Sequence, residues 1–107
     1  MKNIVVQKFG GTSLGSIERI KAVANTIKKT SLNEFPIIVV SAMSGETDKL
    51  INLAKDISDA PAERELDALL STGEKVSAAL LAMTLQSLGL KAKSFSAAQI
   101  SMRTTSN

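Results

Sequence analysis

The chain has 107 residues, of which 44% are apolar and 21% charged, with six glycines, two prolines and no cysteine. This composition fits one soluble globular domain and argues against a disordered, collagen-like or disulfide-stapled chain. The net charge of +3 comes from scattered basic residues, so neither a nucleic-acid-binding stripe nor a polybasic membrane patch is indicated.

The residue types that are absent exclude further classes. Without Cys or His, thiol nucleophiles, Ser-His triads and the common zinc sites are impossible. Any metal should be a hard ion held by oxygen, such as magnesium brought by a nucleotide. No apolar run approaches the ~20 residues of a membrane span, and the first residues lack a signal-peptide core, so we expect a cytoplasmic protein.

The first half of the chain predicts two strands, each followed by a polar or glycine-rich loop. Residues 4–8 are rich in β-branched residues and lead into a glycine-rich segment. Apolar residues at three- and four-residue steps predict a helix over 16–29. After a polar connection, residues 36–40 form a short apolar run with Pro36 at its first position, which is typical of a strand covered on both faces.

Two further helices are expected after a polar turn over 41–48. Apolar residues from Leu50 to Ile57 predict the first of them. Asp59 near the cap and Pro61 in the first turn predict the start of the second, which should run over 62–88 and stop at Gly89.

The remaining residues give weaker signals: 91–97 is weakly strand-like, and 99–107 is polar and indeterminate. Strands that alternate with helices predict a parallel sheet with helices on its faces. Ligands of such sheets bind beyond the carboxyl ends of the strands. This rule selects two loops, 8–15 and 41–48.

The first loop suits a phosphate group. Gly10 and Gly11 let a ligand approach the backbone, and the following helix N-terminus offers unpaired N–H groups. Lys8 adds a full positive charge. The alternative is a tight turn beside a solvated lysine. The spacing is neither that of a P-loop nor that of a dinucleotide fingerprint.

The second loop is rich in small hydroxyl residues that suit a small polar ligand; alternatively, it is only a helix start capped by Thr47 or Ser44. A third candidate lies inside the long helix. Gly73 there indicates close packing or ligand approach, because glycine costs about 1 kcal/mol in a helix interior. Glu74 at the edge of the apolar face needs a cationic partner, either a substrate ammonium group or a nearby lysine.

Three segments, taken together, resemble the aspartokinase family. Residues 8–13 (KFGGTS) resemble its signature, 39–48 (VVSAMSGETD) its second segment and 69–74 (LLSTGE) its third. The likeness covers nearly the whole chain in family order. It implies an amino-acid-kinase (carbamate-kinase-like) fold, a three-layer α/β/α sandwich with a mainly parallel sheet, of which residues 1–107 are the N-terminal part of the catalytic domain.

The resemblance also implies an activity: ATP-dependent phosphorylation of the side-chain carboxylate of L-aspartate, which begins the biosynthesis of lysine, threonine, methionine and diaminopimelate. Mg²⁺ would arrive with the nucleotide. Carried over by position, Lys8 is the catalytic lysine. The ATP-binding residues are Lys8, Phe9, Gly10 and Gly11, and the aspartate-binding residues are Ser41, Thr47 and Glu74.

The family is longer than this chain. The resemblance therefore implies a parent enzyme that is a homo-oligomer and binds a feedback amino acid at ACT domains absent here. We expect the 107 residues alone to be inactive. Two alternatives stay open: an enzyme of the same fold with another acceptor, such as acetylglutamate, glutamate, uridylate or carbamate, and a truncated, non-catalytic binding module.

Overall fold

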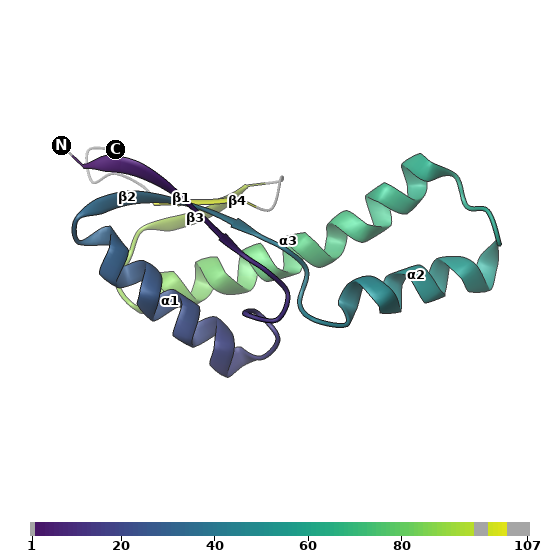
Figure 1. The fold of residues 1–107 in the computed structure, drawn as a ribbon, viewed down its shortest axis with the longest axis horizontal. Helices are drawn as coiled ribbons and strands as arrows, with labels where there is room; N and C mark the ends of the chain where they lie inside the picture. The colour runs from purple at the N-terminus through teal and green to yellow at the C-terminus, as the bar shows by residue number, and fades with distance from the viewer. Residues whose placement is uncertain (1, 96–98, 103–107) are drawn as a thin grey trace.

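The computed structural model describes residues 2–95 and 99–102, which form two layers (Figure 1). A four-stranded sheet lies on one side, and helices α1 and α3 cover one of its faces. The elements, in chain order, are β1 (Asn3–Phe9), α1 (Ile17–Ser31), β2 (Glu34–Val40), α2 (Glu46–Ile57), α3 (Glu63–Ser87), β3 (Ala92–Phe95) and β4 (Gln99–Met102).

The sheet is mixed, which corrects the expected mainly parallel sheet. Its strand order is β1-β2-β4-β3, and only β1 and β2 pair in parallel. β4 pairs antiparallel with both β2 and β3. The described residues also give two layers rather than the three of a sandwich, because helices cover only one face of the sheet.

Strand β4 falls in the stretch that the sequence left indeterminate. Its four residues alternate between exposed and buried, with Ile100 fully buried against the helices. A strand of four residues with two apolar side chains, Ile100 and Met102, gives too little periodicity to be predicted. Strand β3 confirms the strand-like signal at Ala92–Phe95. The remainder of the expected 91–97 strand, and residues 103–107, lie outside the described residues.

The core lies between the sheet and the two helices. α1 contributes Ile20, Val23, Ala24 and Ile27 at the predicted three- and four-residue steps. Leu81 and Leu85 of α3 are fully buried against them, and each such side chain contributes about 1.5–3 kcal/mol.

Strand β2 is buried on one face, not on both as predicted. Its alternate residues Pro36, Ile38 and Val40 are buried under the helices, whereas Ile37 and Val39 are only half-buried on the opposite face. Pro36 is third in the strand rather than first. It lies just outside the three residue pairs that join β2 to β4, so its missing N–H removes none of those described bonds.

Helix boundaries match the predictions at some ends and differ at others. Ser16 caps α1 through its side chain, and Gly89 with φ of 87° follows the end of α3. The predicted side-chain caps of α2 are wrong: Gly45, in the left-handed region with φ of 87°, precedes its first residue. The cap of α3 is Ala62, so Asp59 and Pro61 lie in the connection before it.

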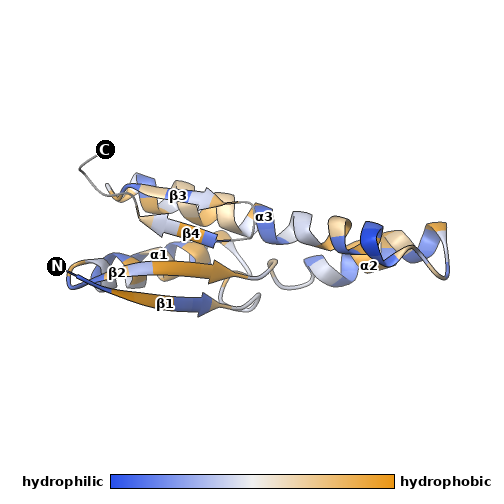
Figure 2. Cartoon of the chain, turned by 90° about the horizontal axis from the view of Figure 1, so that it is seen from above, coloured by the Kyte–Doolittle hydropathy of each residue, from blue (hydrophilic) through white to orange (hydrophobic). Residues whose placement is uncertain are grey.

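Helix α2 and the first part of α3 form an arm that projects beyond the sheet (Figure 1). The arm makes the molecule elongated, 51 by 27 by 19 Å. Among the described elements, α2 contacts α3 alone and has no buried residue. Figure 2 shows the hydrophobic colour over much of β2 and part of β1, whereas the arm is mixed.

Ser77 of α3 is fully buried, and its hydroxyl oxygen has no hydrogen-bond partner among the described residues. A buried hydroxyl without a partner costs about 1–3 kcal/mol, and Ala also favours a helix more than Ser. We expect Ser77→Ala to raise the free energy of unfolding by about 1 kcal/mol. Urea denaturation measures this change, and Ser87→Ala, on the exposed end of the same helix, is the control. A Ser77→Ala variant less stable than the parent would show that the hydroxyl has a favourable partner.

Candidate functional site

The loops that follow β1 and β2 are fixed to each other at the carboxyl ends of the two parallel strands. The N–H of Ser41 donates to the carbonyl of Phe9 at 3.1 Å, which extends the β1–β2 ladder beyond the strands. Three residues after Ser41, the N–H of Ser44 donates to the carbonyl of Gly11, also at 3.1 Å. The two loops selected from the sequence therefore form one continuous surface.

The two adjacent glycines of the first loop have different environments. A Cβ on Gly11 would lie 2.8 Å from the carbonyl oxygen of Ala42 and 3.2 Å from the nitrogen of Ser44, so only glycine fits there. A Cβ on Gly10 would meet nothing within 4 Å, and the φ angle of Gly10 is not positive. The protein itself therefore needs Gly11, whereas Gly10 leaves open space at the surface.

In the first loop, three backbone N–H groups have no described backbone acceptor, whereas two carbonyl groups accept hydrogen bonds. In the described part of the chain, no backbone carbonyl accepts from the N–H groups of Gly11, Thr12 or Ser13. The carbonyl of Gly11 accepts from Leu14 and Ser44, and that of Thr12 accepts from Gly15. Free N–H groups beside a helix N-terminus form a site that attracts anions.

Lys8 is exposed on the sheet face that the helices leave uncovered. Along β1 the half-buried residues are Val5, Gln7 and Phe9, so Lys8 lies on the opposite face. It pairs in register with Val39, and Ser41 comes two residues later, just beyond the end of β2 at Val40. The predicted catalytic cation and a predicted substrate-binding hydroxyl therefore both lie where the paired strands β1 and β2 end.

A hollow of about 460 Å³ opens between the second loop and α3. It brings together all three residues predicted to bind the acceptor: Ser41, Thr47 and Glu74. The other lining residues are Ala42, Asp67, Leu70 and Ser71. Its polar lining consists of three hydroxyl groups and two carboxylates, a set that suits a small ligand with a positively charged group and further hydrogen-bonding atoms.

Gly73 allows α3 to approach the second loop. A Cβ on Gly73 would lie 3.0 Å from the Cβ of Ala42 and 3.6 Å from Cδ1 of Leu50. Carbon atoms normally approach to about 3.5–4.0 Å. Of the two explanations left open for this glycine, close packing is thus the one that the structure supports, and it places Glu74 beside the hollow.

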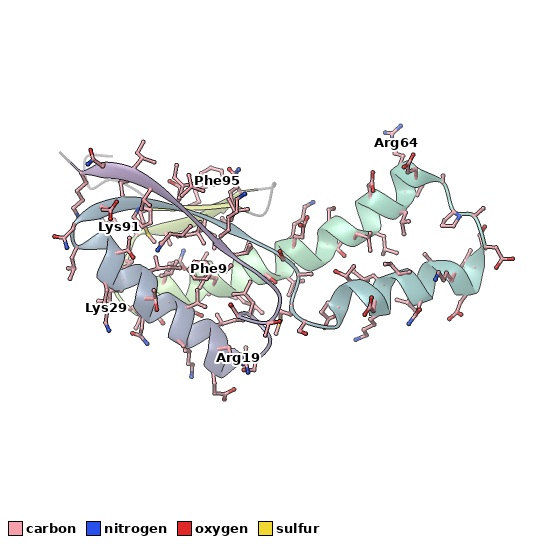
Figure 3. All side chains as sticks on the ribbon, in the orientation of Figure 1. Phe9, Arg19, Lys29, Arg64, Lys91 and Phe95 are labelled. Carbon is pink, nitrogen blue, oxygen red and sulfur yellow. The ribbon has the colours of Figure 1, made fainter. Side chains whose placement is uncertain are left out.

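Phe9 differs from the other predicted ATP-binding residues. Its side chain is half-buried and packs against the hydrophobic core, on the helix side of β1 (Figure 3). Its carbonyl is occupied by Ser41. Phe9 therefore fixes the strand end in position, while the open surface belongs to Lys8, Gly10 and Gly11.

Sequence reasoning missed several residues that the fold places here. Asp67 and Ser71 lie on α3 at seven and three residues before Glu74, so they share its face of the helix. That spacing was available in the sequence as a signal. The free N–H groups of Thr12 and Ser13 were not, because they depend on the conformation of the loop.

The described residues contain no group of three or more acidic side chains that could hold a metal ion. None of their helices combines the length and apolar character that a membrane crossing needs.

Comparison with known families gives a match over almost the whole chain. Residues 3–107 match the model of the amino acid kinase family. Among curated proteins, an aspartokinase of Geobacillus stearothermophilus is 56% identical over 102 residues, which cover 94% of this chain and 25% of that protein. An aspartate kinase of Pseudomonas putida is 51% identical over 105 residues, which cover 97% of this chain and 26% of that protein.

A solved structure supports the fold. The crystal structure of an aspartate kinase from Synechocystis superposes with a TM-score of 0.85 at 53% sequence identity. The match covers 86% of this chain and 16% of the Synechocystis chain. Compared with the Geobacillus and Pseudomonas proteins, the chain spans about a quarter of their length.

The two adjacent glycines allow a matched test of the loop. We expect Gly11→Ala to lower the free energy of unfolding by about 1–3 kcal/mol, because the new methyl group overlaps the backbone of the second loop. Gly10→Ala should change it by less than about 0.5 kcal/mol, since that Cβ enters open space. Chemical denaturation of both variants gives the comparison; equal effects would contradict the close approach at Gly11.

The contact between α3 and the second loop can be tested by moving one methyl group across it. Gly73→Ala adds a Cβ against that of Ala42, whereas Ala42→Gly removes the opposing one. We expect the double variant to be more stable than the sum of the two single changes by about 0.5–3 kcal/mol. Urea unfolding of the four proteins measures this coupling. Strict additivity would mean that the two positions do not press on each other.

Proposed function

Because this chain belongs to the amino acid kinase family, we propose that it forms part of the catalytic domain of an ATP-dependent aspartate kinase. The observation that carries the proposal is geometric. Ser41, Thr47 and Glu74 come from two separate segments and line one hollow, next to a glycine loop with free N–H groups. Identity of about half with proteins named aspartokinase supports aspartate as the acceptor.

The proposed reaction transfers the γ-phosphoryl group of ATP to the side-chain carboxylate of L-aspartate. A carboxylate oxygen forms a bond to the γ-phosphorus. The bond from that phosphorus to the β–γ bridging oxygen breaks, and ADP leaves with the electron pair. No proton has to be removed from the acceptor, so the chain needs no His, Cys or other general base. The product is 4-phospho-L-aspartate.

The chemical difficulty is that two anions must meet. Phosphoryl transfer depends on positioning and on stabilisation of charge more than on covalent help from the protein. We propose that Lys8 and the N–H groups of the glycine loop neutralise the transferred phosphoryl group. The exposed position of Lys8, at the carboxyl end of β1 and in register with β2, supports this role.

The hollow would bind aspartate through groups other than the carboxylate oxygen that attacks the phosphorus. Glu74 is the proposed acceptor for the substrate ammonium, while the hydroxyls of Ser41 and Thr47 donate hydrogen bonds to carboxylate oxygens. The described residues that line the hollow include no cation, and we assign to Lys8, at the end of β1, the charge that balances the substrate's side-chain carboxylate. An acceptor without an ammonium group, such as acetylglutamate, uridylate or carbamate, would leave Glu74 without a partner.

Magnesium would bind with the nucleotide rather than in a preformed protein site. Mg²⁺ commonly keeps several waters and takes its remaining ligands from phosphates and one or two carboxylates. When bound, the metal would supply further positive charge to the phosphates.

The uncovered sheet face supports the finer fold expected from the family. Ile4, Val6 and Phe95 are exposed there at 68%, 56% and 48%. We propose that, in the complete protein, further helices cover this face in a three-layer sandwich whose whole sheet is mainly parallel. The additional length of the relatives would hold those helices and the ACT domains that bind a feedback amino acid. The parent would be a cytoplasmic homo-oligomer, and this chain alone would be inactive.

The role of Lys8 can be tested in the complete enzyme. We expect Lys8→Ala to lower kcat by about 10²–10³-fold, the loss found when a donor to a developing negative charge is removed. The coupled assay follows ADP release with L-aspartate as acceptor. Lys93→Ala, which removes another exposed lysine from the same sheet face, should leave kcat unchanged. Near-normal turnover of Lys8→Ala would refute the proposed role.

A further inference from the structure

Arg19, in the first turn of α1, contacts the glycine loop directly. Its Nη1 donates to the carbonyl oxygen of Thr12 at 3.0 Å, across seven residues of chain. The backbone N–H of Arg19 itself donates to the capping side chain of Ser16 at 3.2 Å. The same short segment thus holds both the backbone and the side chain of Arg19 in place (Figure 3).

The hydrogen bond from Arg19 occupies the carbonyl oxygen of Thr12, an atom that would repel a phosphate group. The Thr12 carbonyl also accepts from Gly15, so its oxygen has two donors. The Gly11 carbonyl is likewise occupied by two donors, Leu14 and Ser44. These four bonds occupy the carbonyl oxygens of Gly11 and Thr12, while the N–H groups of Gly11, Thr12 and Ser13 have no described backbone acceptor.

The positive charge of Arg19 lies at the N-terminus of α1, where Glu18 is the acidic residue of the same turn. A helix N-terminus carries a partial positive charge, and cations in the first turn weaken a helix. A bound phosphate group would reverse the sign of this interaction. Arginine has five N–H donors, and the bond to Thr12 uses one of them.

We infer that Arg19 is a positioning residue for the nucleotide-phosphate loop. It fixes the Thr12 carbonyl so that the loop keeps its donors toward the phosphates, and its charge favours the bound anion. The inference rests on the proposed function, since it assumes that this loop receives ATP. It assigns a role to a residue outside the three segments 8–13, 39–48 and 69–74.

The test compares three variants in the complete protein, with binding of ATP–Mg²⁺ measured by titration calorimetry and turnover measured with L-aspartate. Arg19→Met removes charge and donors at similar length. We expect it to raise the Kd for ATP about tenfold, which corresponds to ~1.4 kcal/mol. Its KM for aspartate should change less than twofold. Arg19→Lys keeps the charge and a donor, and should recover at least half of the lost binding free energy.

The matched control is Arg64→Met, which removes an arginine at the far end of the arm and should leave the Kd for ATP unchanged (Figure 3). If Arg19 only stabilised the fold, Arg19→Met would raise the Kd for ATP and the KM for aspartate together. Alternatively, it would lower the melting temperature without changing the Kd for ATP more than the KM for aspartate.

The outcomes separate this inference from the proposed function. If the parent binds ATP and Arg19→Met binds it equally well, the inference fails, whatever the acceptor. If the parent binds ATP but does not phosphorylate aspartate, the proposed acceptor is wrong, and the calorimetric comparison still decides the role of Arg19. A parent that binds no ATP overturns both.

Discussion

The arrangement of the site depends on a three-way contact at Ala42. The carbonyl of Ala42 faces Gly11 on one side, and its methyl group faces Gly73 on the other, each at a distance that leaves no room for one more carbon atom. Ala42 is itself buried. Because protein interiors are closely packed and yield little, this contact fixes the relative positions of the glycine loop, the second loop and α3. The hollow that holds Glu74 opposite Ser41 and Thr47 follows from it.

The glycine loop shows how backbone chemistry alone can prepare an anion site. Two of its carbonyls, those of Gly11 and Thr12, accept from donors in the second loop, in its own turns and on Arg19, and three of its N–H groups have no described backbone acceptor. Side-chain charge is then added from the strand end by Lys8. The loop and the hollow differ in character: one offers donors and positive charge, and the other offers hydroxyls and carboxylates. A reaction between a phosphorylated donor and an amino acid needs both kinds of surface side by side.

Much of this could be predicted from the sequence, for identifiable reasons. The three- and four-residue periodicity of α1, and Gly89 after the end of α3, placed both helices within a few residues of their observed bounds. The wrong caps of α2 and α3 have a shared cause: Ser44, Thr47 and Asp59 are good capping residues, but the backbone angles at Gly45 and Ala62 placed the helix starts elsewhere. The mixed sheet could not be predicted, because β4 is four residues long and its pairing with β2 is a long-range contact. In the site, residue types and order indicated Ser41, Thr47 and Glu74, yet only the fold showed them lining one hollow.

The isolation of α2 has a consequence for local order. Its contacts with the described elements are limited to α3, and none of its residues is buried, so it can detach without opening the core. Segments of this kind exchange their amide hydrogens early, from states far below global unfolding in free energy. Thr47 lies in the first turn of α2, and Glu74 lies on α3 across the hollow. A molecule held between the two would therefore connect α2, which has no buried residue, to α3, which contributes buried side chains to the core. Part of its binding free energy would then appear as slower amide hydrogen exchange along α2.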